Sequence, residues 1–251
     1  MDEYTNSATR LLAVIEKLQA NPVGTPIALV WAQVLGLDTD KTKEDPHDLR
    51  EKLSLIRLEL NLVQKQMEAK PFSQGLYKPY LGNIRNVVSV SNLDSQWGNF
   101  KHLLNNETIL ALRYCCEILP RDTIIPFTEL EGLLERVMEL KKEIEDSSYA
   151  NDTKEYLLHL LSIMEKGIRD YPLSGGTSFT EAFHEVARVA SNDGPHRVPA
   201  EDDGYAKVMQ LVRGCWSMSK EVVHMDRLLA LVGTKLEQGK LFLEWSITPL
   251  G

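Results

Sequence analysis

The sequence predicts an all-α fold, a multi-helix bundle with long heptad-patterned helices and a short extended C-terminal tail. Two observations support this prediction. Apolar residues recur every three or four positions along most of the 251 residues, which is the spacing of one face of a helix. Capping residues followed by proline, and glycines that follow apolar segments, mark helix ends. A strand-like pattern of β-branched and aromatic residues occurs only in the tail, over residues 240–251.

The limits of the first two helices are indicated by single residues. Asn6 is a good N-cap for a helix over about 7–18. Thr25 and Pro26 fit the cap and the first turn of a second helix, and Gly36 fits the left-handed position after its last residue. The strongly charged residues 37–44 are expected to form a linker.

The third helix has apolar residues on two faces. Asp45 and Pro46 repeat the pattern of a cap followed by proline, and they begin a helix that reaches about Ala69. One face follows a heptad spacing and the other lies opposite it; the residues are Leu49, Leu53, Ile56, Leu60, Val63 and Met67 on the first face and Leu55, Leu58 and Leu62 on the second. We therefore expect this helix to be covered on two sides, in the centre of the bundle.

Shorter helices are expected through the middle of the chain. Residues 70–82 contain two prolines and two glycines and are predicted to form a loop or short turn. Capping boxes at Thr128–Glu131 and Asp152–Glu155 predict the starts of two helices. The other helices are predicted at about 83–91, 95–104, 107–119 and 178–191.

A second heptad pattern follows a stretch that is almost without apolar residues. Residues 192–204 are rich in glycine, proline and acids, and we expect a mobile loop there. An unbroken helix is predicted over about 204–238, and its apolar seam contains the positions that we nominate for self-association, Val208, Leu211, Met218, Val222, Met225 and Leu229. The chain is expected to form one domain, 1–251, with candidate sub-boundaries at 37–45 and 192–204.

The overall charge disfavours two classes of partner. The chain has 36 acidic and 28 basic side chains, a formal net charge of −8. Non-specific binding to nucleic acid or to an anionic membrane needs clustered basic residues, so both are unlikely partners for this chain. No apolar run approaches the length of a membrane span, and the three cysteines show no disulfide spacing. We therefore expect a cytoplasmic protein.

One segment differs from the rest in charge. Residues 71–120 contain three acids and four bases, whereas residues 121–170 contain twelve acids and seven bases. If the protein has a surface for an acidic partner, residues 71–120 are the best place for it. The residues that we nominate for this patch are Arg85, Trp97, Lys101, His102 and Arg113.

The motifs of known chemistry are incomplete. Four glutamates spaced by four residues, from Glu131 to Glu143, could hold a metal only on an inward face, and they fall opposite the apolar face of their helix. The His184–Glu185 pair is followed by Arg188 where a second zinc-binding histidine would be needed. The adjacent Cys115 and Cys116 point about 100° apart on a helix. We therefore nominate no catalytic residue, no cofactor and no metal ligand.

One local string resembles a known group of proteins. The run from Trp97 to Phe100, the Arg113–Tyr114–Cys115 sequence and the segment from Tyr156 to Tyr171 resemble bacterial all-helical proteins to which no activity is assigned. The resemblance covers about a third of the chain. It implies a bacterial cytoplasmic origin and no particular activity.

The leading functional hypothesis is a non-catalytic helical protein that acts by protein–protein interaction or self-association, as an oligomer subunit, an immunity-type factor or a regulator. The alternative is a nucleic-acid- or nucleotide-processing factor that uses the polar residues of 71–120. A DNA-binding helix-turn-helix over 7–36 is disfavoured, because its second helix is apolar almost all round and has few side chains that could read bases.

Overall fold

The computed structural model describes residues 4–197 and 203–222, which are mostly helical, as the sequence predicts. The chain divides into two compact units, which we describe separately. Unit 1 comprises Met1–Arg121 and Pro172–Gly175, and unit 2 comprises Asp122–Tyr171 and Gly176–Gly251. The chain divides after Arg121 and on either side of Pro172–Gly175, outside both candidate sub-boundaries, 37–45 and 192–204.

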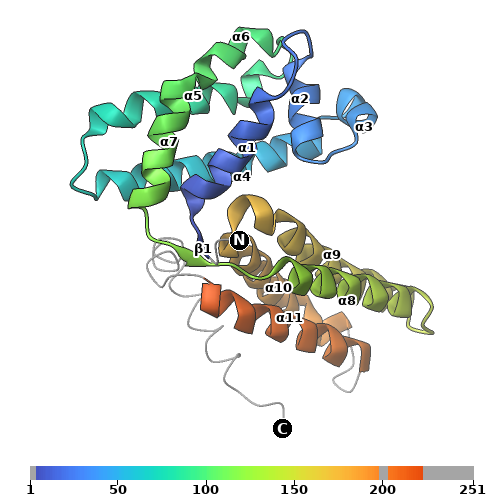
Figure 1. Cartoon of the computed structure of the whole chain (residues 1–251). Helices are drawn as coiled ribbons and strands as arrows, with labels where there is room; N and C mark the ends of the chain where they lie inside the picture. Colours follow the sequence, from blue (N-terminus) through green and yellow to red (C-terminus); the bar gives the residue numbers. More distant parts are fainter. Residues whose placement is uncertain (1–3, 198–202, 223–251) are drawn as a thin grey trace. The chain divides into compact units, whose positions relative to one another are not determined.

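Unit 1 is a cluster of helices around α4 (Figure 1). Its elements are β1 (Tyr4–Thr5), α1 (Ser7–Gln19), α2 (Ile27–Val34), α3 (Thr39–Glu44), α4 (His47–Glu68), η1 (Gln74–Leu76), α5 (Lys78–Val87), η2 (Val90–Asn92), α6 (Gly98–Lys101), η3 (His102–Leu104) and α7 (Asn106–Ile118). Helix α4 packs against α1, α2, α3, α5 and α7. The predicted central position of this helix is therefore confirmed.

The two apolar faces of α4 have different surroundings. The heptad face is buried along its whole length, from Leu49 to Met67. On the second face, by contrast, Leu58 is 53% exposed and Leu55 and Leu62 are half-buried. The prediction that α4 is covered on two sides was therefore wrong for the second face. The helical period shows which residues share a face, but it does not show which face has a neighbour.

The helix ends of unit 1 follow local chemistry. Gly36 has φ +67°, the left-handed conformation predicted for the residue that ends α2. The expected linker 37–44 was wrong, because most of it forms α3. The Asp38 carboxylate accepts hydrogen bonds from the backbone N–H groups of Asp40 at 2.9 Å and Lys41 at 3.1 Å, and so it caps this short helix. The same hydrogen bonds lower the pKa of Asp38.

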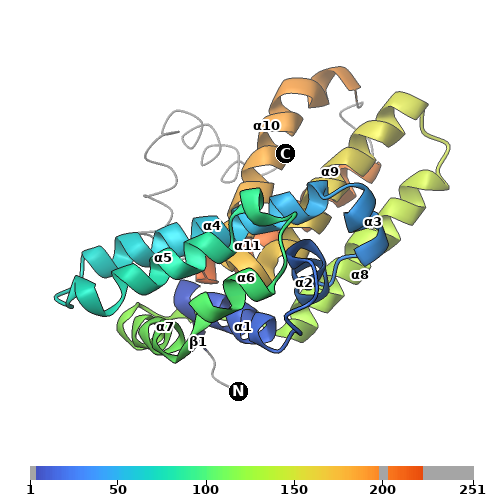
Figure 2. The same ribbon diagram turned by 90° about the horizontal axis from the view of Figure 1, so that it is seen from above.

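Unit 2 consists of helices that run alongside one another (Figures 1 and 2). Its elements are β2 (Asp122–Thr123), α8 (Phe127–Glu145), α9 (Asn151–Ser174), α10 (Gly176–Arg197) and α11 (Asp203–Val222), and the last three residues of α9 belong to unit 1. The core contains the apolar residues predicted to face inward, among them Val137, Leu140, Ile144, Leu157, Leu161 and Met164. No helix in the described ranges is long and apolar enough to cross a membrane.

Two predicted boundaries in unit 2 differ from the structure. Pro126 occupies the N-cap of α8, where no side chain caps the helix, so the capping box at Thr128 was wrong. Helix α10 continues to Arg197, and the loop expected from residue 192 was therefore wrong over its first six residues. Helix α11 continues past Gly214 as predicted and is described to Val222; the rest of the predicted 204–238 helix and the tail lie outside the described residues.

Candidate functional site

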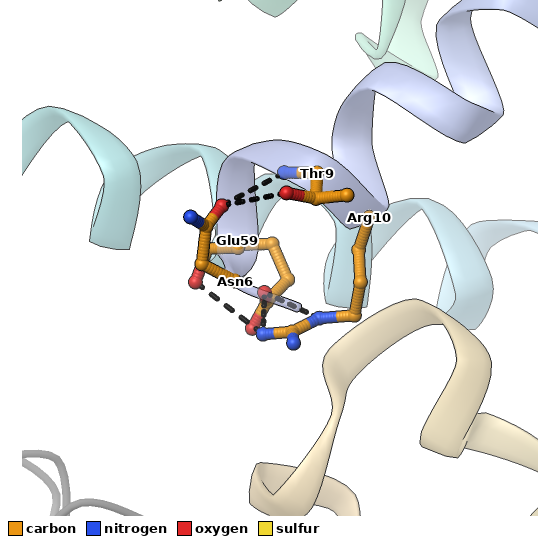
Figure 3. A network of polar contacts seen from close by, with 5 residues as sticks. Asn6, Thr9, Arg10 and Glu59 are labelled. Carbon is orange, nitrogen blue, oxygen red and sulfur yellow. Dashed lines mark hydrogen bonds and ion pairs between the residues drawn. The ribbon is translucent and has the colours of Figure 1, made fainter. Parts of the chain in front are cut away.

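A buried ion pair joins α1 to α4 in unit 1 (Figure 3). The Arg10 guanidinium donates from Nη2 to Glu59 Oε2 at 2.6 Å and from Nε to the same oxygen at 3.1 Å. Arg10 is 7% exposed and Glu59 is 2% exposed. Charges this deeply buried are tolerated only when they are paired and hydrogen-bonded. The pair therefore fixes the register of α1 against α4.

The Asn6 side chain makes hydrogen bonds both within α1 and with the end of α7. Its side-chain oxygen accepts from Thr9 N at 2.9 Å and from Thr9 Oγ1 at 3.0 Å, which caps α1 (Figure 3). Its amide nitrogen donates to the Cys116 carbonyl at 2.8 Å. Asn6 therefore forms hydrogen bonds with both the first turn of α1 and the last turn of α7. The sequence predicted the cap, but it did not indicate the contact with α7, which is 110 residues away.

Gly175 lies against the guanidinium of Arg10 in the polar cluster formed by Asn6, Arg10 and Glu59. This glycine has φ +58°, and a methyl group added to it would lie 2.7 Å from Arg10 Cζ. Arg10 and Glu59 are thus enclosed and leave no room for a substrate. We interpret the cluster as a structural element of unit 1 and not as a catalytic centre.

The basic residues of the predicted partner patch make contacts with neighbouring segments of unit 1. Arg85 Nη2 on α5 donates to Asn61 and Gln64 of α4, at 2.9 Å each. Lys101 Nζ donates to the Asn21 carbonyl at 2.8 Å. Arg113 Nη2 on α7 lies 3.1 Å from Glu16 Oε1 on α1. Each of these groups cross-links two parts of the unit, and no hydrogen bond or ion pair among the described residues joins one to another.

The other two patch residues have opposite environments. Trp97 is fully buried, and its backbone N–H donates to the Thr25 carbonyl at 2.9 Å. It belongs to the core of unit 1 and is not available to a partner. His102 is exposed in η3. Trp97 is therefore excluded from the nominated patch.

A surface that the sequence did not identify lies beside α7. The ring of Phe72, in the α4–η1 loop, is 6.0 Å from the ring of Tyr114 and 6.3 Å from the buried ring of Tyr77. Tyr114 is 41% exposed, and Leu110, one turn before it on α7, is 48% exposed. We call Phe72, Leu110 and Tyr114 the aromatic surface. The sequence feature that could have predicted this surface is the i, i+4 spacing of Leu110 and Tyr114 on the polar side of their helix.

The thiols near this surface are poor nucleophiles. Burial raises the pKa of Cys115 to about 12. Burial also raises the pKa of the half-buried Cys116, against the opposing effect of a hydrogen bond with the Thr9 side chain. Because the thiolate is the reactive species, a raised pKa lowers the nucleophilicity of both cysteines at neutral pH. Burial likewise raises the pKa of the Tyr77 hydroxyl.

The nominated self-association seam begins inside unit 2. Val208 is fully buried and Leu211 is 9% exposed, and both contact the core formed by α8, α9 and α10. They are therefore used within the chain. The side chains of Met218 and Val222 in α11, and the whole of Met225 and Leu229, lie outside what the structure describes.

Within the described ranges, no group of three or more histidine, cysteine or acidic residues could hold a metal ion. The glutamates from Glu131 to Glu143 are exposed on α8, as their position opposite its apolar face predicts. No family model, no curated protein and no solved structure matches the chain.

Proposed function

We propose that this chain is a non-catalytic helical protein that acts by binding another protein. The observation that supports the proposal is the aromatic surface, where Tyr114 and Leu110 are each more than 40% exposed on a helix whose other face belongs to a well-filled core. Aromatic and leucine side chains exposed together are typical of binding surfaces. The proposal includes a cytoplasmic location, in keeping with the free thiols of Cys115 and Cys116.

The distribution of polar groups supports binding over catalysis. The enclosed charges, Arg10 and Glu59, fix two helices. The cationic groups first considered for nucleotide chemistry, Arg85, Lys101 and Arg113, each contact a neighbouring segment. Catalysis requires a nucleophile, base or metal within reach of a substrate cavity. The interaction hypothesis needs no such arrangement.

The experiment is affinity purification of the tagged chain from its native host, with mass spectrometry of what is retained. The test variant replaces Leu110 and Tyr114 by alanine, and the control is Leu58→Ala, which removes an equally exposed leucine from α4. We expect a partner that the wild type and the control retain and the double variant loses. Identical retention by all three proteins would contradict a role for the aromatic surface.

Thermal denaturation in the presence of nucleotides, divalent metals and short RNA or DNA tests the alternative. A ligand that binds only the folded state raises the melting temperature. We expect no shift with any of them. A reproducible rise that disappears in Arg85→Ala or Arg113→Ala would favour a nucleic-acid- or nucleotide-processing factor.

Self-association through α11 is the second version of the same proposal. It depends on Met218, Val222, Met225 and Leu229, because Val208 and Leu211 are buried in unit 2. Light scattering over a wide concentration range should show an oligomer that a charged residue at Met218 or Met225 disrupts before helicity is lost. A strict monomer at all concentrations would exclude this version.

A further inference from the structure

Helix α8 has an apolar stripe on its outer surface. Phe127 is 69% exposed, more than any other large apolar side chain that the structure describes, and Met138 is 49% exposed. Leu134, between them, is half-buried and packs against the edge of the core. Steps of seven and four residues place the three on one face, over about 16 Å of helix. We call Phe127, Leu134 and Met138 the α8 stripe.

Acidic residues border this stripe. Glu131 falls on the same face, between Phe127 and Leu134, and Glu135 lies at its edge; both are exposed. The helix has six glutamates and three basic residues, a net charge of −3. Two of the three basic residues are paired, since Lys141 Nζ lies 2.6 Å from Glu165 Oε2 and Arg136 Nη1 lies 3.5 Å from Glu139 Oε2. The third, Lys142, is exposed one turn after Met138, so the negative part of the border is its N-terminal part, formed by Glu131 and Glu135.

The negative charge beside the α8 stripe favours one kind of partner over others. A second copy of α8 packed in parallel would bring the same glutamates against each other, and like charges across an interface are unfavourable. An anionic membrane would be repelled for the same reason. A helix with apolar residues at i, i+4 and i+7 and flanking lysine or arginine satisfies both the apolar stripe and its acidic border.

We propose that the α8 stripe binds a basic amphipathic helix of a partner protein. The apolar face of that helix covers Phe127, Leu134 and Met138, and its basic residues pair with Glu131 and Glu135. This inference rests on the proposed function of protein binding but concerns a different surface, in unit 2.

The test uses two designed helical peptides of about 18 residues, long enough to form a helix on binding. They have the same leucine spacing, with lysine on the polar positions of one and glutamate on those of the other. Binding to the full chain is measured by fluorescence anisotropy at two salt concentrations. We expect the lysine peptide to bind at least tenfold more tightly than the glutamate peptide, and more weakly at high salt.

Two double variants and two controls locate the binding. Phe127→Ala with Met138→Ala should weaken the lysine peptide about tenfold, and Glu131→Lys with Glu135→Lys should transfer the preference to the glutamate peptide. The controls, Leu58→Ala and Glu107→Lys, change an exposed leucine and an exposed glutamate of unit 1 and should change nothing. All of these side chains are exposed, so circular dichroism should show the same helicity throughout.

Several results would overturn the proposal. They are failure of the lysine peptide to bind, equal binding of both peptides, and equal affinity of the stripe variants and the wild type. A dimer in sedimentation that Phe127→Ala with Met138→Ala abolishes would assign the stripe to a second copy, and binding to phosphatidylserine vesicles in place of the peptide would assign it to a membrane. The Leu110 and Tyr114 variants separate the two hypotheses: they should lose the cellular partner and keep the peptide.

Discussion

The Asn6 amide nitrogen lies 2.8 Å from the Cys116 carbonyl oxygen, so a single side chain at the start of α1 also binds the end of α7. Replacing Asn6 by alanine should lower the free energy of unfolding by about 1–3 kcal/mol, because a cap and a buried donor are lost together. Asn6→Asp keeps the cap oxygen but places a second acceptor against the Cys116 carbonyl oxygen, so it should also destabilise the protein. Urea denaturation followed by circular dichroism measures the free energy of unfolding of both variants. If Asn6→Ala is as stable as the wild type, α7 does not need this contact.

Replacing both members of the Arg10–Glu59 pair should destabilise the protein less than replacing either one alone. Removing either partner leaves the other charge buried without its counter-ion, and Arg10→Met or Glu59→Leu should each cost about 3–5 kcal/mol. The double variant Arg10→Met with Glu59→Leu leaves no such charge and should be more stable than either single variant. Denaturant midpoints of the four proteins form the cycle. Additive losses would mean that the pair is not coupled in the folded state.

Gly175 and Gly132 should respond to alanine in opposite directions. Gly175 has φ +58° and faces the Arg10 guanidinium, so Gly175→Ala should destabilise the protein by about 1–3 kcal/mol. Gly132 lies in α8 with nothing near its missing Cβ, so Gly132→Ala should stabilise it by up to about 1 kcal/mol. Melting temperatures of the two variants give the comparison, and a fall for both would contradict it.

Cys115 should make stability depend on alkaline pH. Its pKa is about 12 in the folded protein and near 9.0 ordinarily, so the folded state retains a proton that the unfolded state releases. The stabilising contribution is full below pH 9 and is lost as the pH rises from about 9 towards 12. Urea midpoints between pH 8 and 11 should fall less steeply in Cys115→Ala than in the wild type. The same slope in both proteins would exclude the thiol as the cause.

The sequence predicted the fold well where local chemistry is sufficient. Gly36 was correctly predicted from conformational preference, which involves only neighbouring residues. The caps before α2 and α4 were predicted one residue too early, because Pro26 and Pro46 themselves occupy the N-cap positions. The buried face of α4 was predicted from its period. Helix α3 was missed because it is short and highly charged and its apolar pattern is weak, although Asp38 is a good cap.

The candidate surfaces were harder to predict because they depend on packing between distant segments. Trp97 is buried beside a segment more than 70 residues away, because the Thr25 carbonyl accepts from Trp97 N–H and the Val23 carbonyl accepts from Gly98 N–H, at 2.9 Å each. Phe72 becomes part of a surface only because Tyr114 is folded beside it. Leu58 and Leu60 are two positions apart in one helix, yet one is exposed and the other buried. The period places these two leucines on opposite faces, but it does not show that the face of Leu58 is the exposed one.

The assignment of Pro172–Gly175 to unit 1 has a consequence for how the protein is made. Leu173 packs against the core of unit 1 and Gly175 lies beside Arg10, although the chain before and after them belongs to unit 2. On the ribosome, the N-terminal helices therefore emerge long before the residues that complete their core. An expressed fragment ending at Arg121 lacks these residues for the same reason, so unit 1 cannot be obtained intact by cutting the chain once.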